Sequence, residues 1–178
     1  VTISNKARDV EVRDDGCGMS REDAELALQR HATSKISTVD DLAAIHTRGF
    51  RGEAVPSIAS VSRLELQTRE PEALSGTRVQ VEGGRIARIE PVGCPPGTRF
   101  QVRDLFFNTP ARLKFLKSVV SETNAIMAIL TRQALAAPHI GFHVVRDGRE
   151  AMNLPPDQPL PDRFASLLGS QIKRDMLP

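Results

Sequence analysis

Cysteine is scarce in this sequence, which has only Cys17 and Cys94 among 178 residues. The two form no C-x-x-C pair and do not cluster with the four histidines, so the sequence favours neither a disulfide framework nor a zinc site. No apolar run approaches the roughly 18 residues that a membrane-spanning helix needs, and the N-terminus lacks a basic-then-apolar signal pattern. We therefore expect a protein of a reducing, intracellular setting with no membrane partner.

The net charge is also small: 24 Lys and Arg residues against 22 Asp and Glu residues give +2. Such a balance does not mark a nucleic-acid binder by bulk electrostatics, so any contact with DNA would need a local basic patch. The length suits one domain with a hydrophobic core, or a core with part of a second domain. Since the chain does not begin with Met, we expect a processed chain or a fragment.

Two common nucleotide-binding motifs are missing. The phosphate-binding loop G-x-x-x-x-G-K-S/T does not occur, and the D-x-G-x-G at Asp14–Gly18 lacks the third glycine of the dinucleotide fingerprint. Residues 1–13 alternate like a β-hairpin, and Ser20 is a predicted N-cap of a helix that runs to about His31. The Asp14 carboxylate either caps this strand-to-helix turn or accepts a hydrogen bond from an amino group such as that of adenine.

A second glycine-rich stretch, Thr47–Val55, sets Gly49 and Gly52 around Arg51 ahead of an apolar, helix-like run. Uncovered backbone N–H groups and the positive end of a helix dipole would suit an anion. The alternative is an ordinary turn with a helix cap, and Glu53 supports it because a carboxylate repels a phosphate.

Two polar segments leave the same kind of choice open. Residues 33–35 carry two hydroxyls and an ammonium, which suit either a solvated loop or phosphate oxygens. Arg112, Lys114 and Lys117 form a small basic group, which is either a solvated face or a contact to the DNA backbone.

The remaining chain predicts a sheet with helices. Alternating patterns predict strands at 63–69, 77–81, 85–89 and 100–103, with a turn at Gly83-Gly84. A helix over 122–137 should pack on the sheet, and a hairpin at 140–153 should turn at Asp147-Gly148. A proline-rich connector, 155–161, precedes an amphipathic helix.

Four segments in order resemble the ATPase region of the MutL family of DNA mismatch-repair proteins: Asp14–Met19, Arg30–Ile36, Gly49–Ala54 and Ser57–Val61. This family belongs to the GHKL superfamily, with gyrase, a heat-shock chaperone and histidine kinases. The block Gly97–Leu116 is similar to the family pattern G-T, then L-F-x-N-T-P-A-R, then K-F-L. Order and spacing match as well as the motifs, so chance is a poor explanation.

The resemblance implies an α/β two-layer GHKL ATPase sandwich, in which helices cover one face of a mixed, mostly antiparallel sheet. Residues 1–154 would form the ATP-binding domain without its first helix. Residues 155–178 would form the connector and the start of the transducer domain. ATP would lie between the helical layer and a mobile lid.

The resemblance also implies which residues hold ATP. Asp14 would bond the adenine amino group, Gly16 and Gly18 would let the base approach, and residues 49–55 would wrap the triphosphate with Arg51 as charge partner. The family's G-T threonine corresponds to Thr98 here. The expected ATP-binding residues are Asp14, Gly16, Gly18, Met19, Thr33, Ser34, Lys35, Gly49, Phe50, Arg51, Gly52, Glu53, Ala54, Val55 and Thr98.

No catalytic or metal-binding residue is expected within the chain. In the family, the water-activating glutamate and the Mg²⁺-binding asparagine belong to an E-x-x-x-N helix that precedes the first hairpin. We therefore expect this chain alone to be inactive, whereas the whole protein would hydrolyse ATP slowly. It would act as a switch that dimerises on ATP binding and signals to mismatch-recognition and other repair proteins on DNA. The competing interpretation is a nucleotide-independent DNA- or protein-binding module.

Overall fold

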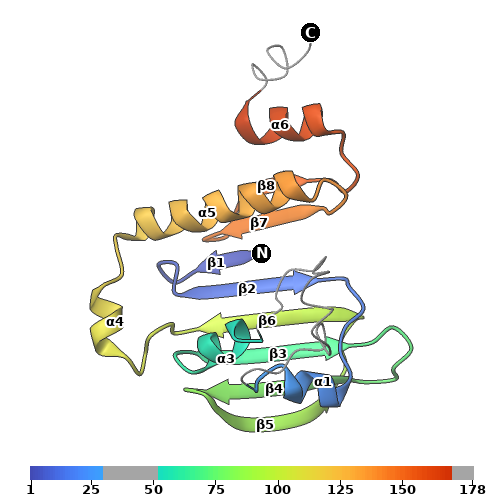
Figure 1. The fold of residues 1–178 in the computed structure, drawn as a ribbon, viewed down its shortest axis with the longest axis vertical. Helices are drawn as coiled ribbons and strands as arrows, with labels where there is room; N and C mark the ends of the chain where they lie inside the picture. Colours follow the sequence, from blue (N-terminus) through green and yellow to red (C-terminus); the bar gives the residue numbers. More distant parts are fainter. Residues whose placement is uncertain (30–51, 170–178) are drawn as a thin grey trace, which may run out of the picture. The chain divides into compact units, whose positions relative to one another are not determined.

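The computed structural model describes residues 1–29 and 52–169. The chain divides into two compact units, Arg8–Phe115 and Val1–Ala7 with the residues from Leu116 onward. Each unit has its own strands and helices (Figure 1). Each also has its own buried cluster.

The unit Arg8–Phe115 is built on five antiparallel strands in the order β5-β4-β3-β6-β2 (Figure 1). Their bounds are β2 Asp9–Asp14, β3 Arg63–Arg69, β4 Gly76–Glu82, β5 Arg85–Val92 and β6 Gly97–Arg103. The strands predicted from alternation are confirmed, and three of them are longer than predicted. Strand β5 continues through Pro91, which has no backbone N–H to donate. Proline is tolerated there because β5 is the edge strand and has a hydrogen-bonded neighbour on one side only.

Three helices described in this unit are short: α1 Arg21–Leu26, α3 Ala54–Ala59 and α4 Pro110–Lys114. The predicted N-cap of α1 is confirmed, since the Ser20 hydroxyl accepts the Asp23 N–H at 3.0 Å. The α-helix ends at Leu26, before the predicted end near His31. The Leu28 and Gln29 N–H groups bond to carbonyls three residues back, so the chain leaves α1 through tighter turns.

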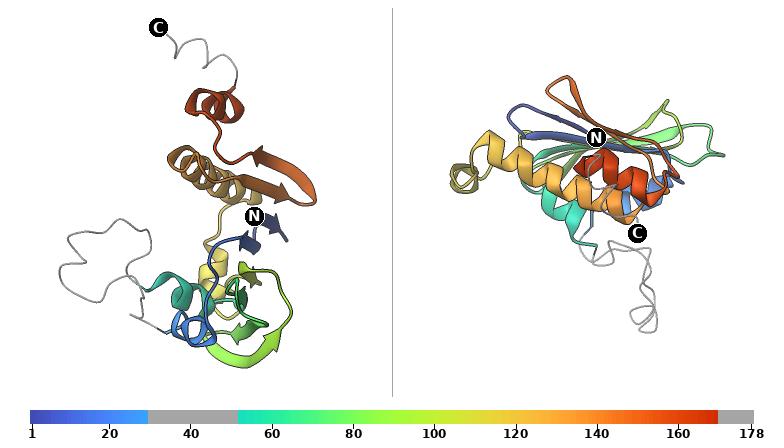
Figure 2. Two further views of the ribbon diagram at one scale, coloured as in Figure 1. Left: turned by 90° about the vertical axis from the view of Figure 1, so that its right-hand side faces the viewer. Right: turned by 90° about the horizontal axis from the view of Figure 1, so that it is seen from above.

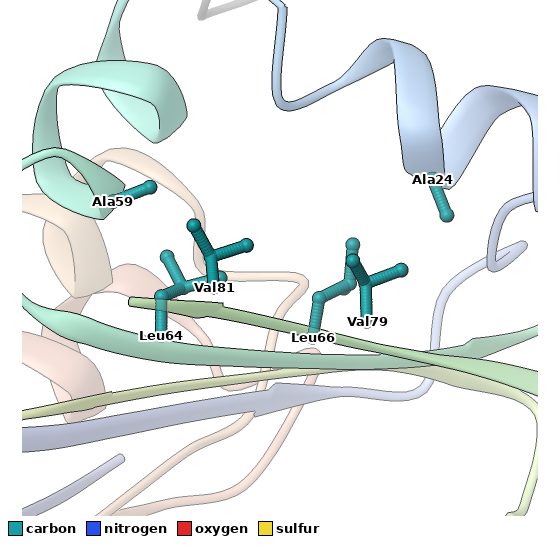
Figure 3. Close-up of a cluster of buried hydrophobic side chains, with 6 residues drawn as sticks. All are labelled: Ala24, Ala59, Leu64, Leu66, Val79 and Val81. Carbon is teal, nitrogen blue, oxygen red and sulfur yellow. The ribbon is translucent and has the colours of Figure 1, made fainter. Parts of the chain in front are cut away.

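Helices α1 and α3 lie on one face of the five strands (Figure 2). Ala24 of α1 and Ala59 of α3 point toward the leucines and valines of β3 and β4, as Figure 3 shows. Alanine has a short side chain, so both helices approach the sheet closely. The buried cluster consists of Ala24, Ala59, Leu64, Leu66, Val79 and Val81.

Charged side chains occupy the alternate positions of the same strands. Arg99 binds Glu11 at 2.7 Å and Glu65 at 3.4 Å, and Arg78 binds Glu90 at 3.1 Å. Burial raises the pKa of Glu65, but hydrogen bonds from two glutamines and the charges of Arg78 and Arg99 outweigh it. The net result is a pKa below the ordinary value of 4.5.

The other unit pairs β1 Thr2–Ser4 in parallel with β7 Phe142–Arg146, and β7 antiparallel with β8 Arg149–Leu154. Its helices are α5 Val119–Ala136 and α6 Leu160–Leu168. The hairpin turn is confirmed at Asp147-Gly148, where both residues have positive φ. The predicted stripe of α5 packs with the strands in one cluster, which contains Ile3, Ile126, Met127, Leu130, Ala134, Val144, Met152 and Leu154.

The predicted class is confirmed: an α/β fold with a mostly antiparallel sheet and helices on one face. Within residues 1–29 and 52–169, no helix is long and apolar enough to cross a membrane.

We expect Leu66→Ala to lower the free energy of unfolding by about 2–5 kcal/mol, because it opens a cavity at a side chain with no exposed surface. Leu74→Ala is the matched control. Leu74 is fully exposed, so the same substitution should change the free energy by less than about 0.5 kcal/mol. Urea denaturation measures both, and equal unfolding midpoints would contradict the placement of the core.

We also expect Glu65 to make stability depend on acid. Its folded-state pKa is lower than its ordinary value, so the native protein binds fewer protons than the unfolded chain. The stabilisation is complete above that ordinary value and is lost as pH falls through the lowered folded-state pKa. Glu65→Gln should therefore flatten the fall of unfolding free energy as pH drops below the ordinary value of 4.5. Glu72→Gln, in an exposed turn, should keep the wild-type slope.

Candidate functional site

Strand β6 places the two predicted nucleotide motifs, the D-x-G-x-G turn and the G-T strand, next to each other in the sheet. Asp14 at the end of β2 lies opposite Thr98 in β6, and Thr98 lies opposite Thr68 in β3. Residues directly opposite in an antiparallel sheet project from the same face, and this face also carries Leu66, two positions before Thr68. The D-x-G-x-G turn and the G-T strand, distant in sequence, therefore meet on the helix-covered face.

The Asp14 carboxylate caps the turn, since its Oδ1 accepts the Gly16 N–H at 3.0 Å. In the described part of the chain, this N–H is the carboxylate's only hydrogen-bond donor. A carboxylate has about four lone-pair sites, and Asp14 is exposed, so acceptor capacity remains. The two interpretations of Asp14, a turn cap and an acceptor for a ligand, are therefore compatible.

Gly18 and Gly97 let segments of the backbone approach one another at the site. Gly18 has a φ of +68°, and a Cβ there would lie 2.0 Å from the Arg69 carbonyl oxygen. Gly97 has a φ of +104°, and its Cβ would lie 2.2 Å from the Asp14 carbonyl oxygen. Both glycines are thus required by the packing of the protein itself. The approach of a base to Gly16 and Gly18 stays a prediction.

The turn is fastened to the sheet through Thr68. The Met19 N–H donates to Thr68 Oγ1 at 2.9 Å. The same oxygen lies 3.2 Å from the Gly97 carbonyl oxygen and 3.2 Å from Thr98 Oγ1. Sequence reasoning placed Thr68 only in a strand. The available signal was a polar residue at an inward position, after Leu64 and Leu66.

The described part of the predicted lid, Gly52–Val55, leads into α3. Gly52 has a φ of +62°, and the Glu53 carbonyl accepts the Ser57 N–H at 3.1 Å, as the residue before a helix does. Val55 packs against the buried cluster. Helix α3 has only six residues, so its dipole is small. The predicted residues Thr33, Ser34, Lys35, Gly49, Phe50 and Arg51 lie outside the described residues.

Open space borders the aligned residues. Asp14, Gly97 and Thr98 line a cavity of about 230 Å³ that Arg13, Gln67 and Arg99 of the charged face also line, and Met19 and Thr68 line another of about 310 Å³. Among the residues that the structure describes, no three His, Cys, Asp or Glu are close enough to hold a metal ion. Arg112 and Lys114 of the predicted basic group are exposed in α4.

No protein-family model matches the chain, but it is similar to sequences and solved structures of one family. The DNA mismatch repair protein MutL of Geobacter sulfurreducens is 51% identical over 169 residues, which are 95% of this chain and 28% of that protein. MutL of Symbiobacterium thermophilum is 51% identical over 179 residues, covering 100% of this chain and 28% of that protein. The chain thus spans 28% of the length of these curated relatives.

Solved structures give the same result. The Aquifex aeolicus MutL ATPase domain complexed with ADP has a TM-score of 0.70 and 29% identity, covering 94% of this chain and 58% of that one. A second structure is the ATPase domain from the bacterial mismatch repair endonuclease Aquifex aeolicus MutL. It has a TM-score of 0.62 and 31% identity, and the match covers 83% of this chain and 50% of that one.

We expect Gly18→Ala to destabilise the protein more than Gly148→Ala, although both residues have positive φ. Left-handed strain costs each variant roughly 1–2 kcal/mol. Overlap with the Arg69 carbonyl adds roughly 1–3 kcal/mol at Gly18 only, because a Cβ at Gly148 would meet nothing within 4 Å. Thermal and urea unfolding measure the difference. Equal losses in the two variants would show that the close packing at Gly18 is wrong.

Proposed function

Because the chain belongs to the MutL family of DNA mismatch-repair proteins, we propose that it is the ATP-binding part of such a protein. The observation that carries the proposal is the alignment of Asp14 with Thr98 at the end of the helix-covered face. These residues come from two of the resembling segments that the structure describes in full, Asp14–Met19 and Gly97–Leu116. The neighbouring MutL ATPase domain complexed with ADP supports an adenine nucleotide as the ligand.

The Asp14 carboxylate recognises the adenine base in this proposal. Its Oδ1 is held by the Gly16 N–H, which fixes the orientation of the carboxylate plane. The remaining lone pairs accept the amino group of adenine, and a hydrogen bond to a charged acceptor is stronger than one to a neutral acceptor. Guanine has a carbonyl oxygen at the corresponding position, which the carboxylate repels, so ATP is preferred to GTP.

The triphosphate is held by residues other than those that recognise the base. We assign it to Thr33, Ser34 and Lys35 and to the lid Gly49–Val55, with Arg51 as the charge partner. Mg²⁺ enters with the phosphates, whose oxygens are its usual ligands.

The proposal for the whole protein is an ATP-driven conformational switch of DNA mismatch repair. It dimerises on ATP binding, acts on DNA and signals to mismatch-recognition and other repair proteins in a bacterial-type cytoplasm. Residues 1–154 form the nucleotide-binding domain, and residues 155–178 form the connector and the start of the transducer domain.

We expect Asp14→Asn to bind a non-hydrolysable ATP analogue with Mg²⁺ roughly ten- to a hundredfold more weakly than the wild type, because the charged acceptor is lost. Isothermal titration calorimetry measures the dissociation constants. Asp15→Asn removes the same charge from the adjacent exposed residue and should bind like the wild type. Equal binding by wild type and Asp14→Asn would refute the adenine assignment.

A further inference from the structure

We propose that Thr68 is a positioning residue of the nucleotide site, which sets the D-x-G-x-G turn relative to the G-T strand. The inference rests on the proposed function and extends it to a residue that the sequence motifs do not contain. Thr68 acts through Met19 and Thr98, with no direct contact to the nucleotide required.

Three segments meet at the Thr68 hydroxyl. The Met19 N–H, from the D-x-G-x-G turn, donates to Thr68 Oγ1 at 2.9 Å. The Gly97 carbonyl and the Thr98 hydroxyl, both from the G-T strand, lie 3.2 Å from the same oxygen. A hydroxyl has one proton and two lone pairs, so one side chain of β3 can serve both motifs together.

Burial makes this hydroxyl difficult to replace. Thr68 has no exposed surface, and Thr98 is 9% exposed, so water does not reach the Thr68 oxygen from the described surface. A valine of the same shape would leave the half-buried Met19 N–H without its acceptor. The chain would then shift to pair this donor elsewhere.

That shift would move the residues that bind the base. Met19 directly precedes Ser20, which caps α1, so the Thr68 bond fixes where the turn ends and the helix begins. Asp14 lies at the other end of the same turn, opposite Thr98. A displaced turn changes the separation of the Asp14 carboxylate from the Thr98 hydroxyl, and misplacement of recognition groups lowers affinity.

Thr68→Val and Thr68→Ser separate the hydroxyl from the methyl group. We expect Thr68→Val to bind a non-hydrolysable ATP analogue roughly tenfold more weakly, since one buried hydrogen bond is lost. Thr68→Ser keeps the hydroxyl and should stay within about threefold of the wild type. The matched control is Thr77→Val, because Thr77 lies opposite Thr68 in β4 and makes no side-chain hydrogen bond within the described residues. Its affinity should equal that of the wild type.

Each outcome of this titration is decisive. If the wild type does not bind the analogue, the proposed function fails. If the wild type binds and Thr68→Val binds equally well, the role of Thr68 fails while the proposed function stands. A loss in the serine variant with none in the valine variant would also overturn the role, because packing of the methyl group would then be responsible.

Hydrogen exchange of the unmodified protein gives a test that does not require a folded variant. The Met19 amide, bonded to a buried hydroxyl, should exchange with deuterium at least tenfold more slowly than the amide of exposed Cys17. Binding of the ATP analogue should slow it further. A Met19 amide that exchanges as fast as that of Cys17 would overturn the proposal.

Discussion

The pairing of β6 with β2 on one side and β3 on the other is the constraint on which the candidate site depends. The two motifs are remote in the chain: Asp14 ends β2, Thr98 is the second residue of β6, and three strands, β3 to β5, lie between them in sequence. Antiparallel hydrogen bonds on both edges of β6 put Asp14, Thr98 and Thr68 at one level across three strands. A shared level on a shared face places the Asp14 carboxylate and the hydroxyls of Thr98 and Thr68 side by side, as the proposed nucleotide site requires.

Close contacts and hydrogen bonds hold the backbone around this level. Gly18 and Gly97 allow contacts that any side chain would prevent, one with Arg69 and one with Asp14. The Arg69 guanidinium then donates to the Cys94 and Ala73 carbonyls, each at 2.7 Å, which ties the loop before β6 to the turn after β3. In the proposed site, these contacts position Asp14 before a ligand arrives, which reduces the entropy lost on binding.

Sequence patterns predicted the features that depend on neighbouring residues alone. Strand alternation located the sheet, and a serine before acidic residues located the start of α1. The end of α1 and the extension of β5 through Pro91 were not predictable, because tertiary position decides both. Thr68 was missed for the same reason: threonine is an ordinary strand residue, and its partners Met19 and Thr98 are remote in sequence. The resemblance supplied Asp14 and Thr98, but their alignment follows from a strand order that no motif contains.

The register of β6 is protected from both faces of the sheet. A slip of one residue against β3 would turn Thr98 toward the charged face, because side chains alternate along a strand. The same slip would carry Arg99 away from Glu11 and Glu65 and bring it toward the buried cluster, where an unpaired charge is costly. Ion pairs on one face and leucines on the other therefore enforce one register. Arg99, on the opposite face, in this way helps determine whether Asp14 and Thr98 share the helix-covered face.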